Sequence, residues 1–211
     1  MIWSALIEGM SYGLVLSVLV GPMFFTIVQV GIERGFKAGT ALVAGQWISD
    51  FVYMGLVFWG ASYIQVLVDD EAARNSFIFY MGIIGSVILV GFGVAMILKE
   101  SVVRNQLKVK KSTLLGYGVQ GFLLNTFNPT PLFFWMALMS SALTKGYSSN
   151  VSYVLFGSVM FVVIVTDILK VYLAKRIRTV LKDQYILYVR RLAGAVLIGF
   201  GLWLIIKVLT L

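Results

Sequence analysis

All three prolines of the chain lie inside two hydrophobic stretches, at corresponding places in its two halves. Pro22 follows Gly21 in GLVLSVLVGPMFFTIVQVG, and the other two lie in GFLLNTFNPTPLFFWMALM as Pro129 and Pro131. Proline cannot donate the helical hydrogen bond and its ring clashes with the preceding turn, so each site predicts a helix broken at about mid-depth of a membrane. Carbonyl groups freed in lipid need protein or water partners, so broken helices occur where they line a cavity. Matched interruptions in two repeats therefore predict the binding site of a transporter.

The composition predicts an integral membrane protein. Hydrophobic residues make up 60% of the 211 residues and charged residues make up 12%, whereas a soluble domain carries about 25% charged residues. A membrane crossing needs roughly 20 predominantly apolar residues. The sequence offers six such stretches, at 4–30, 38–66, 77–98, 114–142, 149–172 and 187–209. They use most of the chain, so we expect a single membrane domain over residues 1–211.

The basic residues predict the orientation in the membrane. The net charge is +8, and if the six spans alternate, 14 of the 17 Lys and Arg residues fall on one side. We expect a multi-pass protein of the inner (plasma) membrane of the cell. The positive-inside rule then predicts that both termini lie on the outer side of this membrane. Basic charge on the inner side also attracts the anionic lipid of the bilayer. The charge therefore requires no nucleic-acid partner.

The basic segment 99–113 divides the chain into two halves of three spans each, with repeat one at 1–98 and repeat two at 114–211. Because three is an odd number, the second half enters the membrane from the opposite side, and segment 99–113 is cytoplasmic. The expected fold class is an all-α integral membrane protein with six transmembrane helices, built as an inverted 3+3 repeat with a broken first helix in each half. Glycines spaced four apart, such as Gly9 and Gly13, permit close packing within the bundle and are also compatible with a homodimer.

Asp50 is the strongest candidate for a functional residue within the membrane. It lies among apolar residues in LVAGQWISDFVYMGLVF, and a charged side chain at the centre of a bilayer costs roughly 2.5–3.5 kcal/mol. Such residues usually face a cavity or a partner. Gln46, four residues earlier, shares the same helical face. The alternative is that Asp50 hydrogen-bonds the backbone that is freed near Pro22.

Asp167 is a second aspartate inside a predicted span, and like Asp50 it lies in the second span of its half. Lys170 follows it by three residues, which is close enough on a helix for the lysine to neutralise the aspartate. A structural ion pair and a functional role therefore both stay open for Asp167.

Polar side chains also flank the second helix break. Asn125 and Asn128 are three residues apart and share a helical face beside Pro129. Their amides can bind the carboxylate or ammonium group of a zwitterion without placing a fixed charge in lipid, or they can hydrogen-bond the freed backbone. In the first half, the bare backbone of Gly21 beside Pro22 can approach a ligand closely, although a plain kink is the alternative.

The residue types exclude several classes of chemistry. The chain has no cysteine and no histidine, which excludes disulfides, thiolate metal sites and histidine-based catalysis. No Walker A sequence is present, so we do not expect ATP coupling within this chain. Two intramembrane aspartates could form an aspartyl protease dyad, but the flanks ISDF and VTDI lack the glycine-rich sequence of such enzymes. We therefore expect neither an enzyme nor a cofactor.

Two aspartates and two asparagines could also bind a hard divalent cation, which leaves a divalent-cation exporter as the alternative to a carrier of organic solutes.

Two segments of the sequence combine into a family pattern. GPMFFTIVQVGIERGFKAGTALVAGQWISD contains Gly21-Pro22, Gly35, Gly39, Gly45 and Asp50. GFLLNTFNPTPLFFW contains Gly121, Asn125, Asn128, Pro129 and Phe134. With these segments and its six expected spans, the whole chain resembles the LysE family (LysE/RhtB) of amino-acid exporters.

The resemblance implies export of amino acids or close derivatives across the inner membrane, energised by a proton or other ion gradient. It also implies that Asp50 and the Asn-Pro segment hold central positions, and that the solute is small and zwitterionic or cationic. The wider superfamily includes exporters of divalent cations, so resemblance in fold does not decide the cargo.

Overall fold

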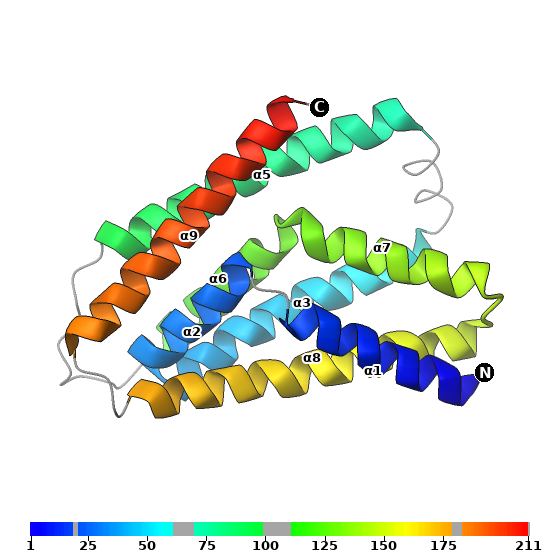
Figure 1. The fold of residues 1–211 in the computed structure, drawn as a ribbon, viewed down its shortest axis with the longest axis horizontal. Helices are drawn as coiled ribbons and strands as arrows, with labels where there is room; N and C mark the ends of the chain where they lie inside the picture. Colours follow the sequence, from blue (N-terminus) through cyan, green and yellow to red (C-terminus); the bar gives the residue numbers. More distant parts are fainter. Residues whose placement is uncertain (19–20, 61–69, 99–110, 179–182, 211) are drawn as a thin grey trace.

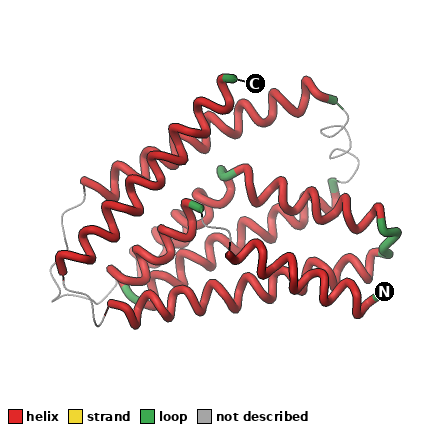
Figure 2. Tube along the Cα trace, viewed as in Figure 1, coloured by secondary structure: helices red, strands yellow, loops and turns green. Residues whose placement is uncertain are grey.

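The computed structural model describes residues 1–18, 21–60, 70–98, 111–178 and 183–210, and the regular structure of these residues is entirely helical (Figures 1 and 2). Eight helices follow one another in this part of the chain: α1 (Ile2–Val18), α2 (Pro22–Arg34), α3 (Phe36–Trp59), α5 (Glu71–Leu98), α6 (Lys111–Thr126), α7 (Pro129–Thr144), α8 (Ser149–Arg178) and α9 (Asp183–Leu209). The expected all-α class is confirmed for the described residues.

Several of these helices have the length and composition of membrane crossings. Four qualify individually: α3, Ile78–Leu98 of α5, Ser149–Ile177 of α8 and Tyr185–Leu209 of α9. The helices α1 and α2 qualify only together, as a pair bent by 71°, and α7 contains a shorter apolar helix at Thr130–Thr144. Large apolar side chains are exposed on several helices, among them Leu14, Ile48, Phe161 and Trp203. An apolar surface of this kind suits contact with lipid, so the helices are those of a multi-pass membrane protein.

Both predicted helix breaks are present. The helix α2 begins at Pro22 with Gly21 as its N-cap residue, and α7 begins at Pro129 with Asn128 as its N-cap residue. Proline is tolerated at the first helical position because the N–H that it lacks would have no helical partner there. Pro131 differs from the prediction: it lies inside the first turn of α7 and makes no break of its own. Figure 1 shows both breaks about halfway along the bundle.

Some helices extend beyond the apolar stretches that predict them. Residues 99–110 of the expected loop 99–113 lie outside the described residues, but α6 already begins at Lys111. In the same way, α5 begins at Glu71 and α8 continues to Arg178. Residues 61–66 of the second predicted span also lie outside the described part. Hydropathy indicates where the chain leaves the lipid. The backbone hydrogen bonds of a helix can continue into water, so a helix can extend beyond its apolar stretch.

Two close helix pairs, α1 with α8 and α3 with α6, form the body of the bundle. Both depend on glycine, because a Cβ atom at Gly9 would collide with the carbonyl oxygen of Leu155, and one at Gly121 with that of Leu42. Gly13 likewise faces α8, so the spacing of Gly9 and Gly13 supports packing inside the chain. The homodimer stays a prediction. The helices α5 and α9 form a third pair along one side of the body, which they touch through α2, α6 and α7 (Figure 1).

Ion pairs tie helices together near both ends of the bundle. Both termini lie toward the end where α7 is followed by α8, and α2 is followed by α3 at the opposite end (Figure 1). Gly35 joins α2 to α3. Gly35 has a φ of 81°, which glycine adopts without steric cost. Near this second end, Arg190 Nε of α9 lies 3.4 Å from Glu33 Oε1 of α2, and the side chains are 3% and 10% exposed. At the first end, Lys145 Nζ lies 2.7 Å from Glu8 Oε2 of α1 on the surface.

Candidate functional site

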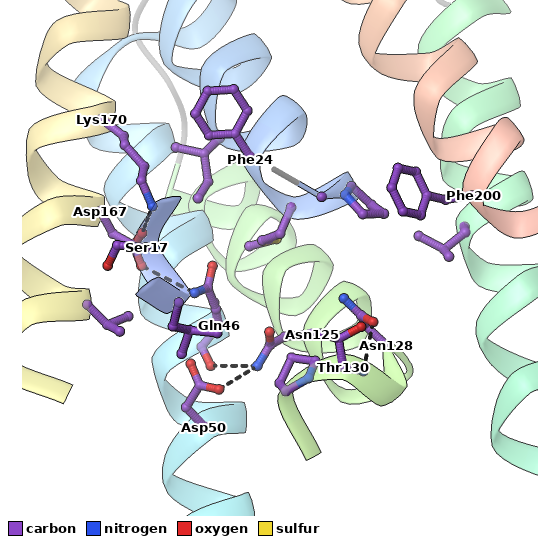
Figure 3. A pocket seen from close by; sticks show the side chains of 18 of the residues that line it. Ser17, Phe24, Gln46, Asp50, Asn125, Asn128, Thr130, Asp167, Lys170 and Phe200 are labelled. Carbon is purple, nitrogen blue, oxygen red and sulfur yellow. Dashed lines mark hydrogen bonds and ion pairs between the residues drawn. The ribbon is translucent and has the colours of Figure 1, made fainter. Parts of the chain in front are cut away.

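A cavity of about 250 Å³ lies between the two helix breaks (Figure 3). Both broken pairs contribute to its wall, together with α3, α5, α8 and α9. The lining residues are Leu16, Ser17, Gly21, Pro22, Met23, Phe24, Ile27, Gln46, Asp50, Leu89, Asn125, Asn128, Thr130, Pro131, Val163, Asp167, Lys170, Phe200, Trp203 and Leu204. The volume corresponds to about eight molecules of liquid water, so the cavity has room for a small solute.

The structure brings the residues that the sequence singles out to this one cavity. Those that line it are Gly21, Pro22, Gln46, Asp50, Asn125, Asn128 and Asp167. Pro129 lies between the lining residues Asn128 and Thr130, and its side chain is outside what the structure describes. Residues more than 100 positions apart in the chain thus share one site, because α3 packs against both α6 and α8.

Asp50 is buried where α3 meets α6 and α7. Its side chain is 2% exposed, and its Oδ1 accepts hydrogen bonds from Asn125 Nδ2 at 3.0 Å and from Trp135 Nε1 at 3.1 Å. These partners are side chains of the second half, whereas one alternative placed Asp50 against the backbone near Pro22. Both donors are neutral, and no ion pair joins Asp50 to a cation among the described residues. The carboxylate therefore has hydrogen-bond partners but lacks a counter-ion there.

Asp167 of α8 differs from Asp50 because it has a cationic partner. Its Oδ1 lies 2.9 Å from Lys170 Nζ, which is the ion pair that the spacing along the helix indicates. Its Oδ2 accepts hydrogen bonds from Gln46 Nε2 at 3.2 Å and from Trp47 Nε1 at 3.1 Å. Asp167 itself is 1% exposed, so all its partners approach it inside the bundle and link α8 to α3.

Gln46 joins the two aspartates into one network (Figure 3). Its side chain donates to Asp167, and its backbone carbonyl accepts from Asn125 Nδ2 at 3.4 Å. Asn125 in turn donates to Asp50. The other side-chain atom of Gln46, Oε1, is buried without a hydrogen-bond partner among the described residues. An unpaired buried acceptor costs about 1–3 kcal/mol, so a donor from a solute or from water is favoured at this atom.

Hydroxyl groups satisfy part of the backbone at the breaks. Thr26 Oγ1 donates to the carbonyl of Pro22 at 2.9 Å, and the hydroxyl of Tyr53 donates to the carbonyl of Thr126. Asn128 Oδ1 accepts from Thr130 N at 3.1 Å and so caps α7. Asn128 thus makes the backbone hydrogen bond that one of the two alternatives predicts. Asn125 instead bonds a carboxylate.

Trp135, which bonds Asp50, and Lys170, which lines the cavity, also belong to the site, although the sequence patterns do not mark them as site residues. Trp135 is fully buried and stacks on Phe156 at a centroid distance of 5.5 Å, while its N–H reaches Asp50. A buried indole N–H usually finds an acceptor, and that requirement was the available signal. The spacing predicts that Lys170 is a neighbour of Asp167, but spacing along one helix does not reveal that Lys170 faces a cavity.

Comparison with known proteins identifies the family. The LysE type translocator family matches residues 14–208. The chain belongs to this family. This translocator is also 26% identical over 198 residues to "Putative amino acid efflux protein YcgF" of Bacillus subtilis (strain 168), in an alignment that covers 90% of each chain. No solved structure matches the translocator. The resemblance drawn from the Gly-Pro and Asn-Pro segments is confirmed.

The arrangement of the acidic residues bears on the cargo. Within the described residues of the translocator, no group of three or more carboxylates is placed to hold a metal ion. Hard divalent cations bind several oxygen ligands, usually including carboxylates. Asp50 and Asp167 are the two carboxylates among the described residues that line the cavity.

Proposed function

We propose that the protein is a secondary transporter that exports amino acids or close derivatives across the inner membrane, in antiport with protons or another ion. The observation that carries the proposal is the cavity between the two helix breaks, where carboxylates and amides form one network around space for a small solute. The volume lies below the roughly 300–1,000 Å³ of pockets for drug-sized ligands, which suits a smaller molecule. Membership of the translocator family and the printed name of the Bacillus subtilis relative also support efflux.

In this proposal the solute binds among polar side chains from both halves, namely Gln46, Asp50, Asn125, Asn128 and Asp167. The backbone at the breaks, at Gly21, Pro22 and Pro129, completes the site. The unpaired Oε1 of Gln46 accepts from an ammonium group of the solute. A Cβ at Gly21 would meet no atom within 4 Å, so its backbone faces open space. Asp50 lacks a described counter-ion, and it exchanges a proton for the solute during transport.

The six-span inverted repeat belongs to the same proposal. In it, α1–α2 and α6–α7 each count as one crossing, so that α3 corresponds to α8 and α5 to α9. The packing supports this correspondence: α1 with α8 matches α6 with α3, α2 with α9 matches α7 with α5, and α5 pairs with its own counterpart α9. One repeat then rocks against the other around the cavity. Basic residues near the α2–α3 end support a cytoplasmic location for that end and an outside location for both termini, by the positive-inside rule.

Counterflow in proteoliposomes tests the function. Vesicles that contain the purified protein are preloaded with single amino acids from a panel, and uptake of the labelled amino acid is measured with and without a pH gradient. We expect exchange of one or a few amino acids by the wild type. In Asp50→Asn, which keeps an oxygen for Asn125 and Trp135, exchange should persist while gradient-driven uptake is lost. Asp70→Asn is the matched control, because Asp70 is an exposed residue before α5.

The possible results separate the two candidate cargoes. Absence of exchange with every amino acid, together with flux of Mn²⁺ or Cd²⁺, would establish the divalent-cation alternative instead. Gradient-driven uptake that survives in Asp50→Asn would remove Asp50 from the coupling step while leaving the exporter intact.

A further inference from the structure

Lys170 is the one positively charged side chain among the described residues that line the cavity. Its side chain is 20% exposed, so it reaches the cavity and is not sealed in the protein. A lysine within a membrane segment is costly unless it pairs or faces water, and such residues usually mark a functional pathway. Because Lys170 both pairs with Asp167 and reaches the cavity, it is a candidate for contact with the solute.

The contacts of Asp167 fix the position of this lysine. The Asp167 side chain is 2% exposed and holds Lys170 Nζ with Oδ1, while Gln46 and Trp47 occupy Oδ2. With donors on both oxygens, Asp167 is engaged by the protein itself. Within the described residues Lys170 Nζ donates one hydrogen bond, whereas an ammonium group has three donors. Two donors of Lys170 thus remain for a solute in the cavity.

The charged side chains are therefore distributed unevenly around the cavity. Lys170 and Asp167 lie at one side of it, and Asp50 with its neutral donors lies at another (Figure 3). Gly21, Pro22 and Phe24, at the start of α2, also line the cavity, and the start of a helix carries partial positive charge. No side chain caps this start, because Gly21 is its N-cap residue. The remaining donors of Lys170 and the uncapped start of α2 share the cavity with the carboxylate of Asp50, which has no described counter-ion, and this arrangement suits a molecule with one acidic and one basic group.

We propose that Lys170 binds the carboxylate of the solute and sets the specificity for carboxylate-bearing cargo. Asp167 is a positioning residue that holds Lys170, and the ammonium end of the solute faces Asp50 and Gln46. This inference rests on the proposed function and narrows it. Amines and carboxamides that lack a free carboxylate are rejected because they offer no anionic acceptor to the two remaining donors of Lys170, and hydrogen bonds to an ionised acceptor are the stronger ones.

The test compares neutral L-amino acids with their own carboxamides in proteoliposome counterflow. The pair has nearly the same shape, and only the amino acid carries a carboxylate. For the wild type we expect preference for the amino acid on the order of 10–100-fold in kcat/KM, the range of one charge-assisted hydrogen-bonded contact. Lys170→Met, which keeps the length but removes the charge, should raise KM for the amino acid and abolish this preference. Lys170→Arg should retain the preference because it keeps the positive charge.

Controls separate this role from a merely structural one. Lys175→Met removes an exposed lysine of the same helix and should leave the preference unchanged. Asp167→Asn, which keeps an acceptor for Lys170, should weaken the preference less than Lys170→Met does. If Lys170→Met does not fold, the wild type still decides, since equal transport of amino acid and carboxamide overturns the inference.

Failure of the inference and failure of the proposed function give different results. Exchange of amino acids by the wild type without discrimination against carboxamides, or discrimination that survives in folded Lys170→Met, overturns the role of Lys170 alone. No exchange of any amino acid overturns the proposed function, and the role of Lys170 falls with it.

Discussion

The close contact of α3 with α6 determines whether Asp50 can reach Asn125, and a single methyl group tests it. A Cβ built at Gly121 of α6 would collide with Leu42 O and lie 2.9 Å from Leu42 C, whereas carbon atoms pack at about 3.5–4.0 Å. In Gly121→Ala the two helices must therefore separate by about 1 Å. The hydrogen bond from Asn125 to Asp50, now 3.0 Å long, would then exceed 3.5 Å and be lost.

The expected cost combines two unfavourable effects with one favourable effect. Overpacking costs about 1–3 kcal/mol, and loss of a buried hydrogen bond costs about 1–3 kcal/mol. Replacing glycine by alanine in a helix gains about 1 kcal/mol. The net destabilisation is about 3 kcal/mol, which lowers Tm by about 6–12 °C for a chain of this size.

Gly116, on the same helix, provides the matched control. A Cβ there would meet no atom within 4 Å, so Gly116→Ala receives only the gain in helix propensity and should raise Tm slightly. Both variants are compared by thermal unfolding in detergent and by amino-acid counterflow, with Gly121→Ala losing exchange and Gly116→Ala keeping it. If Gly121→Ala were as stable and active as Gly116→Ala, α3 and α6 would not approach as described.

Two further predictions concern other contacts of the bundle. Asn128→Ala removes the N-cap of α7 and should cost about 1 kcal/mol of stability, whereas Asn128→Ser, which can still cap, should restore Tm; exchange that is lost in both variants would instead indicate direct contact with the solute. Arg190→Met removes the cation that lies 3.4 Å from the largely buried Glu33 and should destabilise the protein by about 3–5 kcal/mol. The double variant Arg190→Met with Glu33→Leu should recover most of this loss in a thermal unfolding assay. A single variant as stable as the wild type would contradict the pairing of α2 with α9.

The helix breaks could be predicted from sequence because proline acts locally. Pro22 and Pro129 each begin a helix in the structure, since the missing N–H affects the turn that contains it and needs no distant partner. Pro131 was misjudged for a related reason: two positions into a helix that has just begun, its missing N–H again has no helical partner. The positions of prolines therefore predict where a helix starts more reliably than they predict the number of helix breaks.

The sequence predicted which residues form the candidate site, but it did not predict which side chains on other helices they contact. Burial of Asp50 and Asp167 in apolar stretches carries a cost that points to a cavity, and both residues line one. The spacing along the helix predicts Lys170 as a partner of Asp167, but the partners that lie on other helices could not be foreseen. Asp167 is held by Gln46 across 121 positions of the chain, and Asp50 by Trp135 across 85. No local pattern encodes such pairs, because they depend on which helices pack together.

The sequence by itself determined that this protein is a multi-pass membrane protein of the LysE type translocator family, with helices broken at Pro22 and Pro129. Hydropathy and the effect of proline each depend on the residues of a single helix, so both can be read from the local sequence. Only the tertiary structure decided that α3 packs against both α6 and α8, and hence that Asp167 is bonded by Gln46 while Asp50 is bonded by Asn125 and Trp135 and lacks a described counter-ion. The charge distribution in the cavity depends on side chains from distant positions in the chain, and the packing of the helices determines which of them meet.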